Sequence, residues 1–202
     1  MIIQVLLGVV KLLEIKNLTY KIKDKCLFDD VSITIYDNDI IFLLGNNGCG
    51  KSTLLNIISN AYKIKRININ NTFKELFYLA DKFTLINNKT SLDNLIIFNN
   101  LFKSKTNVYY LLDSLQIENR KVSKLSKGNR QKLGLALSLL SSAELILIDE
   151  ALDGLDNESI KVFIKLVKEL NKALVIVTHD NRIYKYKNVR RLRIEKGKIY
   201  EV

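Results

Sequence analysis

Runs of apolar residues along the chain predict the strands of a sheet. Residues 39–44, 144–149 and 173–177 are almost continuously apolar, which is typical of strands that are covered on both faces of a parallel sheet. Residues 31–36 alternate apolar and polar side chains, and residues 12–20 contain a second strand pattern. The chain therefore predicts a mostly parallel sheet that is preceded by an N-terminal antiparallel β edge.

Apolar residues at helical spacing follow most of these strands. Residues 52–60 and 158–170 each predict one helix, and residues 87–115 predict two. Residues 76–79 form another short apolar run and predict a strand, after a short polar connection over residues 60–75. Strands that alternate with helices in this way predict an α/β fold.

The composition fits one packed domain without a membrane-spanning helix. Of the 202 residues 48% are hydrophobic, and no run reaches the roughly 18 apolar residues that a spanning helix needs. The apolar start over residues 1–10 lacks a positive leading region and a cleavage site, so we expect an extension or an edge strand there rather than a signal peptide. Two cysteines without ligand spacing indicate a reducing compartment.

The net charge of +11 raises the question of a nucleic-acid or anionic membrane partner. The lysines are scattered, and no basic stripe with interleaved aromatic residues stands out. The chain is rich in Lys, Asn and Ile and contains no Pro, which favours a biased codon pool as the source of the charge. We therefore expect no nucleic-acid partner on the ground of charge.

The segment Gly45–Thr53 fits the pattern G-x-x-x-x-G-K-[ST] without a gap, between a predicted strand and a predicted helix. In this pattern the glycines allow a tight turn whose N–H groups point at phosphate oxygens, with the positive end of the helix behind them. Lys51 is then expected to reach the β- and γ-phosphates, and the Ser52 hydroxyl to bind Mg²⁺. The predicted nucleotide-binding residues of this loop are Gly45, Asn46, Asn47, Gly48, Cys49, Gly50, Lys51, Ser52 and Thr53.

Two carboxylates end the apolar strand over residues 144–149. Asp149 is placed to hold the Mg²⁺ shell, and Glu150 to polarise an attacking water molecule. An acidic pair that merely caps a strand is the alternative. Upstream, Ser126 and Gly128 lie in a turn that opens an apolar helix, where they could bind a γ-phosphate or simply start the helix.

Two further residues are placed where a nucleotide would need them. His179, the one histidine of the chain, follows the strand over residues 173–177 directly, at the edge of the sheet where ligands bind in such folds. Tyr20 precedes the glycine loop by about 25 residues, where its ring could stack on an adenine base or could simply pack in a strand.

The order of these motifs resembles that of the ATP-binding cassette (ABC) ATPase family from about Leu12 to Val202. On this resemblance, residues 45–53 are similar to the Walker A loop and residues 145–150 to the Walker B strand. Residues 125–129 resemble the signature motif, and residues 153–156 the D-loop that follows the carboxylates. The resemblance implies a P-loop NTPase core in a single domain over 1–202, with an inserted helical subdomain over about 84–140.

The resemblance also implies roles for individual residues. Glu150 would be the catalytic base, His179 the switch histidine that contacts the γ-phosphate and orients the water, and Tyr20 the ring that stacks on adenine. In this family two domains pair head to tail, so Ser126 and Gly128 would bind the nucleotide of the partner copy. The implied cofactors are ATP and Mg²⁺.

The sequence departs from the family pattern at three places. Lys127 and Asn129 replace a glycine and a glutamine of the signature motif, and Ala151 replaces the usual proline after the Walker B carboxylates. Asp81 stands where the family has a glutamine that senses Mg²⁺ and contacts the membrane subunit. An aspartate there could still bind Mg²⁺, directly or through water.

The resemblance predicts an ATPase subunit of a membrane ABC transporter, most similar to small exporters. Its expected partners are membrane-spanning subunits and a second ATPase subunit, with a homodimer favoured. The expected location is the cytoplasm, at the inner face of a membrane. Two alternatives remain: a non-transport ABC protein that acts on nucleic acid or a ribosome, and a regulatory ATP-binding subunit with weak hydrolysis.

Overall fold

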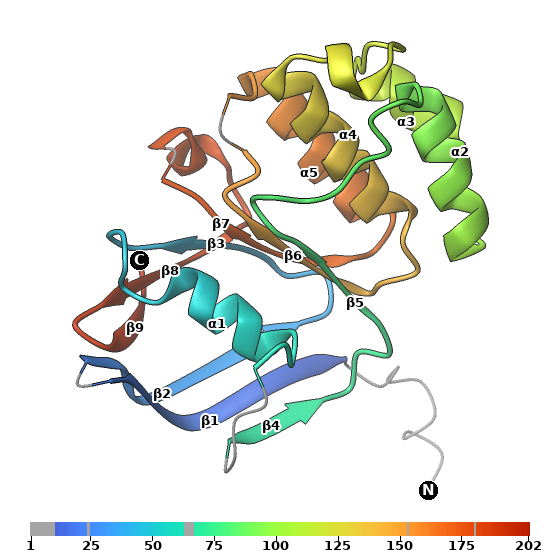
Figure 1. Ribbon diagram of the computed structural model, residues 1–202. Coiled ribbons are helices and arrows are strands. Elements are labelled where there is room, and N and C mark those ends of the chain that lie inside the picture. The colour runs from blue at the N-terminus through green and yellow to red at the C-terminus, as the bar shows by residue number, and fades with distance from the viewer. Residues whose placement is uncertain (1–10, 24, 63–66, 153, 180) are drawn as a thin grey trace, which may run out of the picture.

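The computed structural model describes residues 11–23, 25–62, 67–152, 154–179 and 181–202 (Figure 1). The predicted extension or edge strand over residues 1–10 lies outside these residues. None of the helices within the described residues combines the length and the apolar character that crossing a membrane requires.

A six-stranded sheet forms the centre of the molecule (Figure 1). Its order is β5-β6-β7-β3-β8-β9, and all neighbouring strands are parallel except β8 and β9, which form an antiparallel hairpin. The strands are β3 (Ile40–Leu44), β5 (Leu76–Leu79), β6 (Leu145–Asp149), β7 (Ala173–Val177), β8 (Arg190–Glu195) and β9 (Lys198–Glu201).

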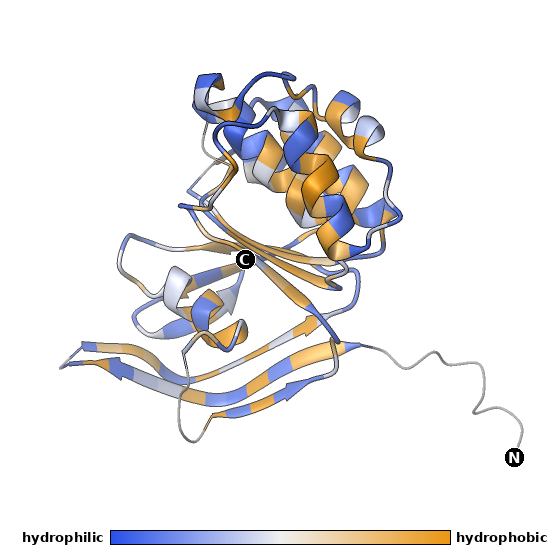
Figure 2. Ribbon diagram, turned by 45° about the vertical axis from the view of Figure 1, so that its right-hand side comes forward, coloured by the Kyte–Doolittle hydropathy of each residue, from blue (hydrophilic) through white to orange (hydrophobic). Residues whose placement is uncertain are grey.

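Both faces of the central strands are buried, as their continuous apolar runs predict. Side chains alternate between the faces of a strand, and in β3 Phe42 packs in one apolar cluster while Ile41 and Leu43 pack in the other. Figure 2 shows hydrophobic residues along these strands and on the helices that cover them.

One face of the sheet is covered by a layer of helices. The helices are α2 (Ser91–Phe102), α3 (Val108–Ser114), α4 (Lys127–Leu140) and α5 (Asn157–Glu169), with a short 3-10 helix at Val122–Lys124. The start of α2 is fixed by Thr90, whose hydroxyl accepts from the Asp93 amide while the Asp93 carboxylate accepts from the Thr90 amide. The helices α2, α3 and α4 lie within the range of about 84–140 for which a helical subdomain is predicted.

The other face of the sheet is covered by α1 (Lys51–Ile58), which lies between the central sheet and a second, three-stranded sheet. The second sheet is antiparallel, with the order β2-β1-β4. Its strands are β1 (Leu12–Ile22), β2 (Lys25–Tyr36) and β4 (Asn68–Asn71). The predicted antiparallel edge is therefore present as a sheet of its own.

The structure adds elements that the pattern did not predict. Within the connection expected over residues 60–75, β4 pairs with β1 through its backbone while all four of its side chains are exposed. Two further elements follow β7: a 3-10 helix at Asn181–Lys185 and the β8–β9 hairpin. The predicted buried strands and the predicted helices are present, with ends that shift by a few residues.

Candidate active site

The carboxyl ends of three neighbouring parallel strands bring the predicted site residues to one edge of the sheet. Gly45 follows β3, Glu150 follows β6, and His179 comes two residues after β7. The Glu150 amide donates to the carbonyl of Val177, 3.1 Å away, which ties the end of β6 to the end of β7. In open parallel sheets this edge is where ligands bind.

The first turn of α1 provides backbone donors for an anion. The residue before the helix is Gly50, its N-cap, whose φ of 116° is positive and which supplies no side-chain cap. A side chain at this position is excluded, because a Cβ would lie 2.9 Å from the ring of Phe28. The N–H groups of the first turn are therefore free to bind phosphate oxygens at the positive end of the helix.

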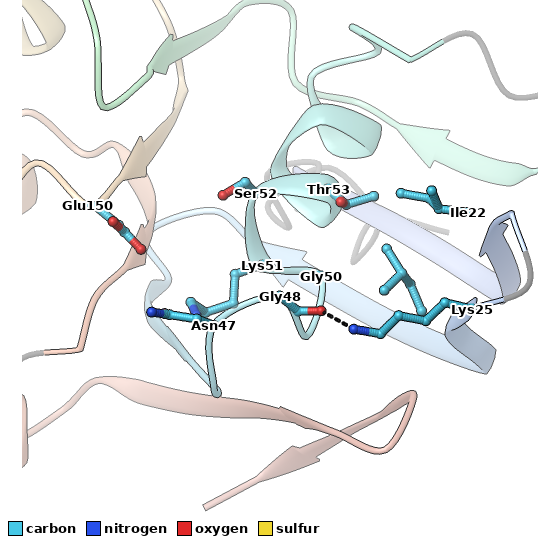
Figure 3. Close-up of a pocket in the computed structure, with 10 residues that line it drawn as sticks. Ile22, Lys25, Asn47, Gly48, Gly50, Lys51, Ser52, Thr53 and Glu150 are labelled. Carbon is cyan, nitrogen blue, oxygen red and sulfur yellow. Dashed lines mark hydrogen bonds between the residues drawn. The ribbon is translucent and has the colours of Figure 1, made fainter.

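A pocket of about 540 Å³ opens in front of this helix. Its volume lies in the range of about 300–1,000 Å³ that is typical of small-molecule sites. Figure 3 shows Glu150 on one side of the loop and Ile22 and Lys25 on the other. The lining residues are Ile22, Lys25, Leu27, Asn47, Gly48, Gly50, Lys51, Ser52, Thr53 and Glu150.

Lys51 lies in the loop with its ammonium group already oriented. The Nζ atom donates to the carbonyl oxygens of Gly45 at 2.7 Å and Asn46 at 3.2 Å, and the residue is buried. An ammonium group has three donors, so these two bonds leave one for a phosphate oxygen. Gly45 and Asn46 thus serve the site through their carbonyls, and the Cys49 side chain is partly buried against the core.

Glu150 and His179 contact each other across the ends of β6 and β7. The Nε2 atom of His179 lies 3.3 Å from Oε1 of Glu150, and both side chains are partly exposed. Glu150 adopts a φ of 55°, a left-handed conformation that is uncommon for a residue with a side chain. Such backbone conformations persist where the surroundings enforce them, and they cluster at active sites.

Asp149 is buried beside Glu150 and fits the role of a Mg²⁺ ligand. Its Oδ2 atom accepts a hydrogen bond of 3.2 Å from the Tyr78 hydroxyl, and its Oδ1 atom is buried without a hydrogen-bond partner within the described part of the chain. A buried carboxylate oxygen without a partner calls for an explanation, and a cation supplies one. Together with the Ser52 hydroxyl, Asp149 offers the hard oxygen donors that Mg²⁺ prefers.

Across the described residues no cluster of three or more His, Cys, Asp or Glu side chains forms a metal cage. A Mg²⁺ ion takes one or two protein oxygens and completes its shell with phosphates and water. Sequence reasoning missed Tyr78, because its contact with Asp149 depends on the pairing of β5 with β6.

Tyr20, predicted either to stack on adenine or to pack in a strand, is not among the residues that line the pocket. Tyr20 is partly buried and packs against the apolar core of the second sheet. Ile22, at the end of β1, lines the pocket instead and is 44% exposed. The adjacent Lys25 donates from Nζ to the Gly48 carbonyl, 2.9 Å away, so the β1–β2 hairpin is tied to the glycine loop (Figure 3).

Asp81, predicted as a Mg²⁺ residue, is not among the residues that line this pocket. It lines a second pocket of about 390 Å³ between residues 81–87 and the start of α4. The residues that line this second pocket are Asp81, Lys82, Phe83, Thr84, Leu85, Asn87, Lys127, Arg130 and Gln131.

The predicted signature residues also lie outside the nucleotide pocket of their own chain. Ser126 caps α4, and its hydroxyl accepts from the Asn129 amide at 3.2 Å. Asn129, one of the departures from the family pattern, accepts from the Glu118 amide at 2.9 Å and so fastens the start of α4. A Cβ at Gly128 would lie 3.2 Å from the Gly154 carbonyl, so the signature and the D-loop are in contact.

Comparisons with known proteins agree on the family. The sequence profile of the ABC transporter family matches residues 28–153. The zinc import ATP-binding protein ZnuC of Rickettsia bellii is 33% identical, over 84% of this chain and 76% of its own length. The cytochrome c biogenesis ATP-binding export protein CcmA of Reclinomonas americana is 31% identical, over 84% of this chain and 85% of its own length.

A solved structure shares the fold. The dimeric structure of the ATP-binding cassette MJ0796, in a post-hydrolysis state bound to ADP and Pi, superimposes with a TM-score of 0.75 at 24% identity. The match covers 94% of this chain and 97% of that one.

Proposed function

Because the chain belongs to the ABC transporter family and is an ATP-binding cassette ATPase domain, we propose that it is the subunit that powers a membrane transporter by hydrolysing ATP between two paired copies. The observation that supports this most directly is the pocket that joins Lys51, Ser52 and Glu150 at one edge of the sheet.

Groups of the chain itself would bind most of the triphosphate and orient it. The first-turn amides of α1 and the ammonium group of Lys51 bind the phosphates, and Ser52 and Asp149 hold Mg²⁺. When bound, Mg²⁺ neutralises negative charge on the phosphate oxygens. Glu150 accepts a proton from the attacking water, and His179 holds the Glu150 carboxylate in position from the end of β7.

The base of the nucleotide lies against the β1–β2 hairpin in this proposal. Ile22 and Leu27 supply an aliphatic surface there, and Lys25 adds a positive charge between that surface and the glycine loop. Tyr20 has no role in base binding in this arrangement.

A second copy completes the site. Ser126 and Gly128 lie outside the pocket of their own chain, yet Ser126 stands at the N-terminus of α4, where an anion is favoured. Pairing two copies head to tail brings this helix end to the partner's γ-phosphate. The dimeric state of the MJ0796 cassette supports the pairing of two copies of this chain.

The pocket that contains Asp81 is the proposed contact for a membrane-spanning subunit, which would hold the chain at the inner face of a membrane. It combines Phe83 and Leu85 with the cations Lys82, Lys127 and Arg130, so an apolar segment with acidic residues would fit it.

Export is the proposed direction of transport. The export protein CcmA supports it, while ZnuC, named for import, matches at similar identity. A transport assay in vesicles with the reconstituted membrane partner decides between the two directions.

The test of the paired ATPase is ATP-dependent dimerisation, followed by light scattering on purified chain. With ATP and Mg²⁺ we expect Glu150→Gln to accumulate as a dimer, because binding persists while hydrolysis stops. Lys51→Ala is the matched control and should remain monomeric, because it removes the cation that binds the phosphates. A Glu150→Gln chain that binds ATP and stays monomeric would refute the pairing.

A further inference from the structure

Tyr78 links the two residues that are proposed to hold Mg²⁺. It lies on β5 opposite Leu147 of β6. Since side chains on one face of a strand recur every second residue, Tyr78 lies on the same face as Asp149, two residues beyond Leu147. The Tyr78 hydroxyl donates to Oδ2 of Asp149 at 3.2 Å.

The same hydroxyl is also held from α1. Asn56 follows Ser52 by one helical turn and donates from Nδ2 to the Ser52 carbonyl, 2.7 Å away. The Asn56 side chain also lies within interaction distance of the Tyr78 hydroxyl. A row of polar groups therefore runs from the Ser52 carbonyl through Asn56 and Tyr78 to Asp149. These groups connect α1 to the end of β6.

These polar contacts fix the rotation of the Asp149 carboxylate. Oδ2 is occupied by Tyr78, whereas Oδ1 is buried and has no hydrogen-bond partner among the described residues. The Tyr78 hydroxyl is the donor in this hydrogen bond, because an ionised carboxylate oxygen only accepts. Since Oδ2 already accepts from Tyr78, Oδ1 is the carboxylate oxygen best placed to accept from a hydrated cation.

We propose that Tyr78 is a positioning residue of the Mg²⁺ site: its hydroxyl, braced by Asn56, holds the Asp149 carboxylate so that Oδ1 faces the hydrated cation. The inference rests on the proposed function, because it presumes that Ser52 and Asp149 share one cation. Residues that orient metal ligands change metal affinity by about 10- to 100-fold when they are removed. Because Tyr78 contributes a single neutral hydroxyl, we expect its effect on metal affinity to lie near the lower end of this range.

The test is the affinity of the full chain for Mn²⁺ with saturating ADP, measured from the EPR signal of free Mn²⁺. We expect Tyr78→Phe to weaken Mn²⁺ binding by about three- to tenfold. Its affinity for a fluorescent ADP analogue in EDTA should stay within about twofold, because no metal is needed there. The matched control is Tyr62→Phe, a neighbouring tyrosine that is 43% exposed, which should leave both affinities unchanged.

The other possible results distinguish a failure of the positioning role from a failure of the proposed function. If wild-type chain binds ADP and Mn²⁺, and Tyr78→Phe binds Mn²⁺ equally well, the positioning role is wrong while the proposed function stands. An equal loss of metal-free ADP affinity in Tyr78→Phe would also overturn it, because the damage would then be general. Wild-type chain that binds no nucleotide would refute the proposed function itself.

A second variant tests whether Asn56 supports the position of Tyr78. Asn56→Ala should weaken Mn²⁺ binding less than Tyr78→Phe does, and the double variant should be no weaker than Tyr78→Phe alone, since both act through one carboxylate. If the losses of Mn²⁺ affinity in the two single variants add fully in the double variant, Asn56 and Tyr78 do not act through one carboxylate.

Discussion

The Nε2 atom of His179 lies 3.3 Å from Oε1 of Glu150, so the ends of β7 and β6 share one contact at the mouth of the nucleotide pocket. Glu150 holds a left-handed backbone conformation and is tied to β7 through its amide. The proposed catalytic base, Glu150, is therefore positioned through both its backbone amide and its side chain.

His179→Ala tests this contact. We expect kcat for ATP hydrolysis to fall about 100-fold, because a misplaced base loses its alignment with the water. ATP affinity should change less than about twofold, since His179 is absent from the lining of the pocket. Steady-state kinetics and a nucleotide titration measure the two effects, and His179→Gln, which keeps an N–H donor, should recover part of kcat. A loss of affinity without a loss of kcat would count against the assignment.

The variant Ile22→Tyr tests where the adenine base of ATP lies. An aromatic ring at this exposed position should stack on the base and tighten ATP binding by about three- to tenfold. Tyr20→Leu is the control and should leave ATP affinity unchanged, because Tyr20 packs against the core. Fluorescence titration with both variants is sufficient. If Tyr20→Leu weakens ATP binding while Ile22→Tyr does nothing, the sequence-based position was right after all.

Gly134→Ala tests the packing behind the second pocket. A Cβ at Gly134 would lie 2.4 Å from the ring of Phe83, which lines that pocket. We expect the substitution to destabilise the chain by about 1–2 kcal/mol through this overlap. In a Phe83→Ala background the same change should stabilise it by about 0.5–1 kcal/mol, because alanine is the better helix former. Chemical denaturation measures both, and equal effects in the two backgrounds would exclude the contact.

Glu144 gives a stability effect that depends on pH. Its carboxylate accepts from Lys11 Nζ at 2.6 Å and from the Lys74 amide at 2.9 Å. The hydrogen bond from Lys11, aided by that from Lys74, lowers the pKa of Glu144 below its ordinary value. A lowered folded-state pKa stabilises the fold above the unfolded-state pKa, and this stabilisation is lost as the pH falls through the folded-state value.

Glu144→Gln should therefore lower Tm by about 1–3 °C near pH 7, and the difference from wild type should shrink toward about pH 3. Thermal melts across this range provide the measurement. A difference in Tm that stays constant with pH would show that the charge of Glu144 is not involved.

Local patterns predicted much of the fold and of the site. The runs in β3, β6 and β7 are apolar because both faces are covered, and the glycine loop has a spacing that phosphate binding requires. The alternation of Leu192 and Ile194 before Gly197 would also have indicated the β8–β9 hairpin. By contrast β4 is wholly exposed and owes its form to backbone pairing with β1, which no side-chain pattern records.

Two features of the site depend on contacts that sequence spacing does not encode. The pairing of β1 with β2 is irregular between Leu18 and Tyr20 and again between Tyr20 and Lys21. Such irregularities change the direction in which side chains point, so counting residues back from the loop could not show that Ile22 lines the pocket. The contact of Tyr78 with Asp149 joins residues 71 positions apart and required the strand order of the sheet.

The measurement that tests the central claim most directly is the rate of ATP hydrolysis by purified chain as a function of protein concentration, with Glu150→Gln as the control. If two copies share each ATP, the rate rises more steeply than in proportion to concentration and then becomes linear once pairing is complete, and the Glu150→Gln chain shows no hydrolysis. A rate that stays proportional to concentration down to the lowest levels, or that persists in Glu150→Gln, would contradict a paired ATPase with Glu150 as its base.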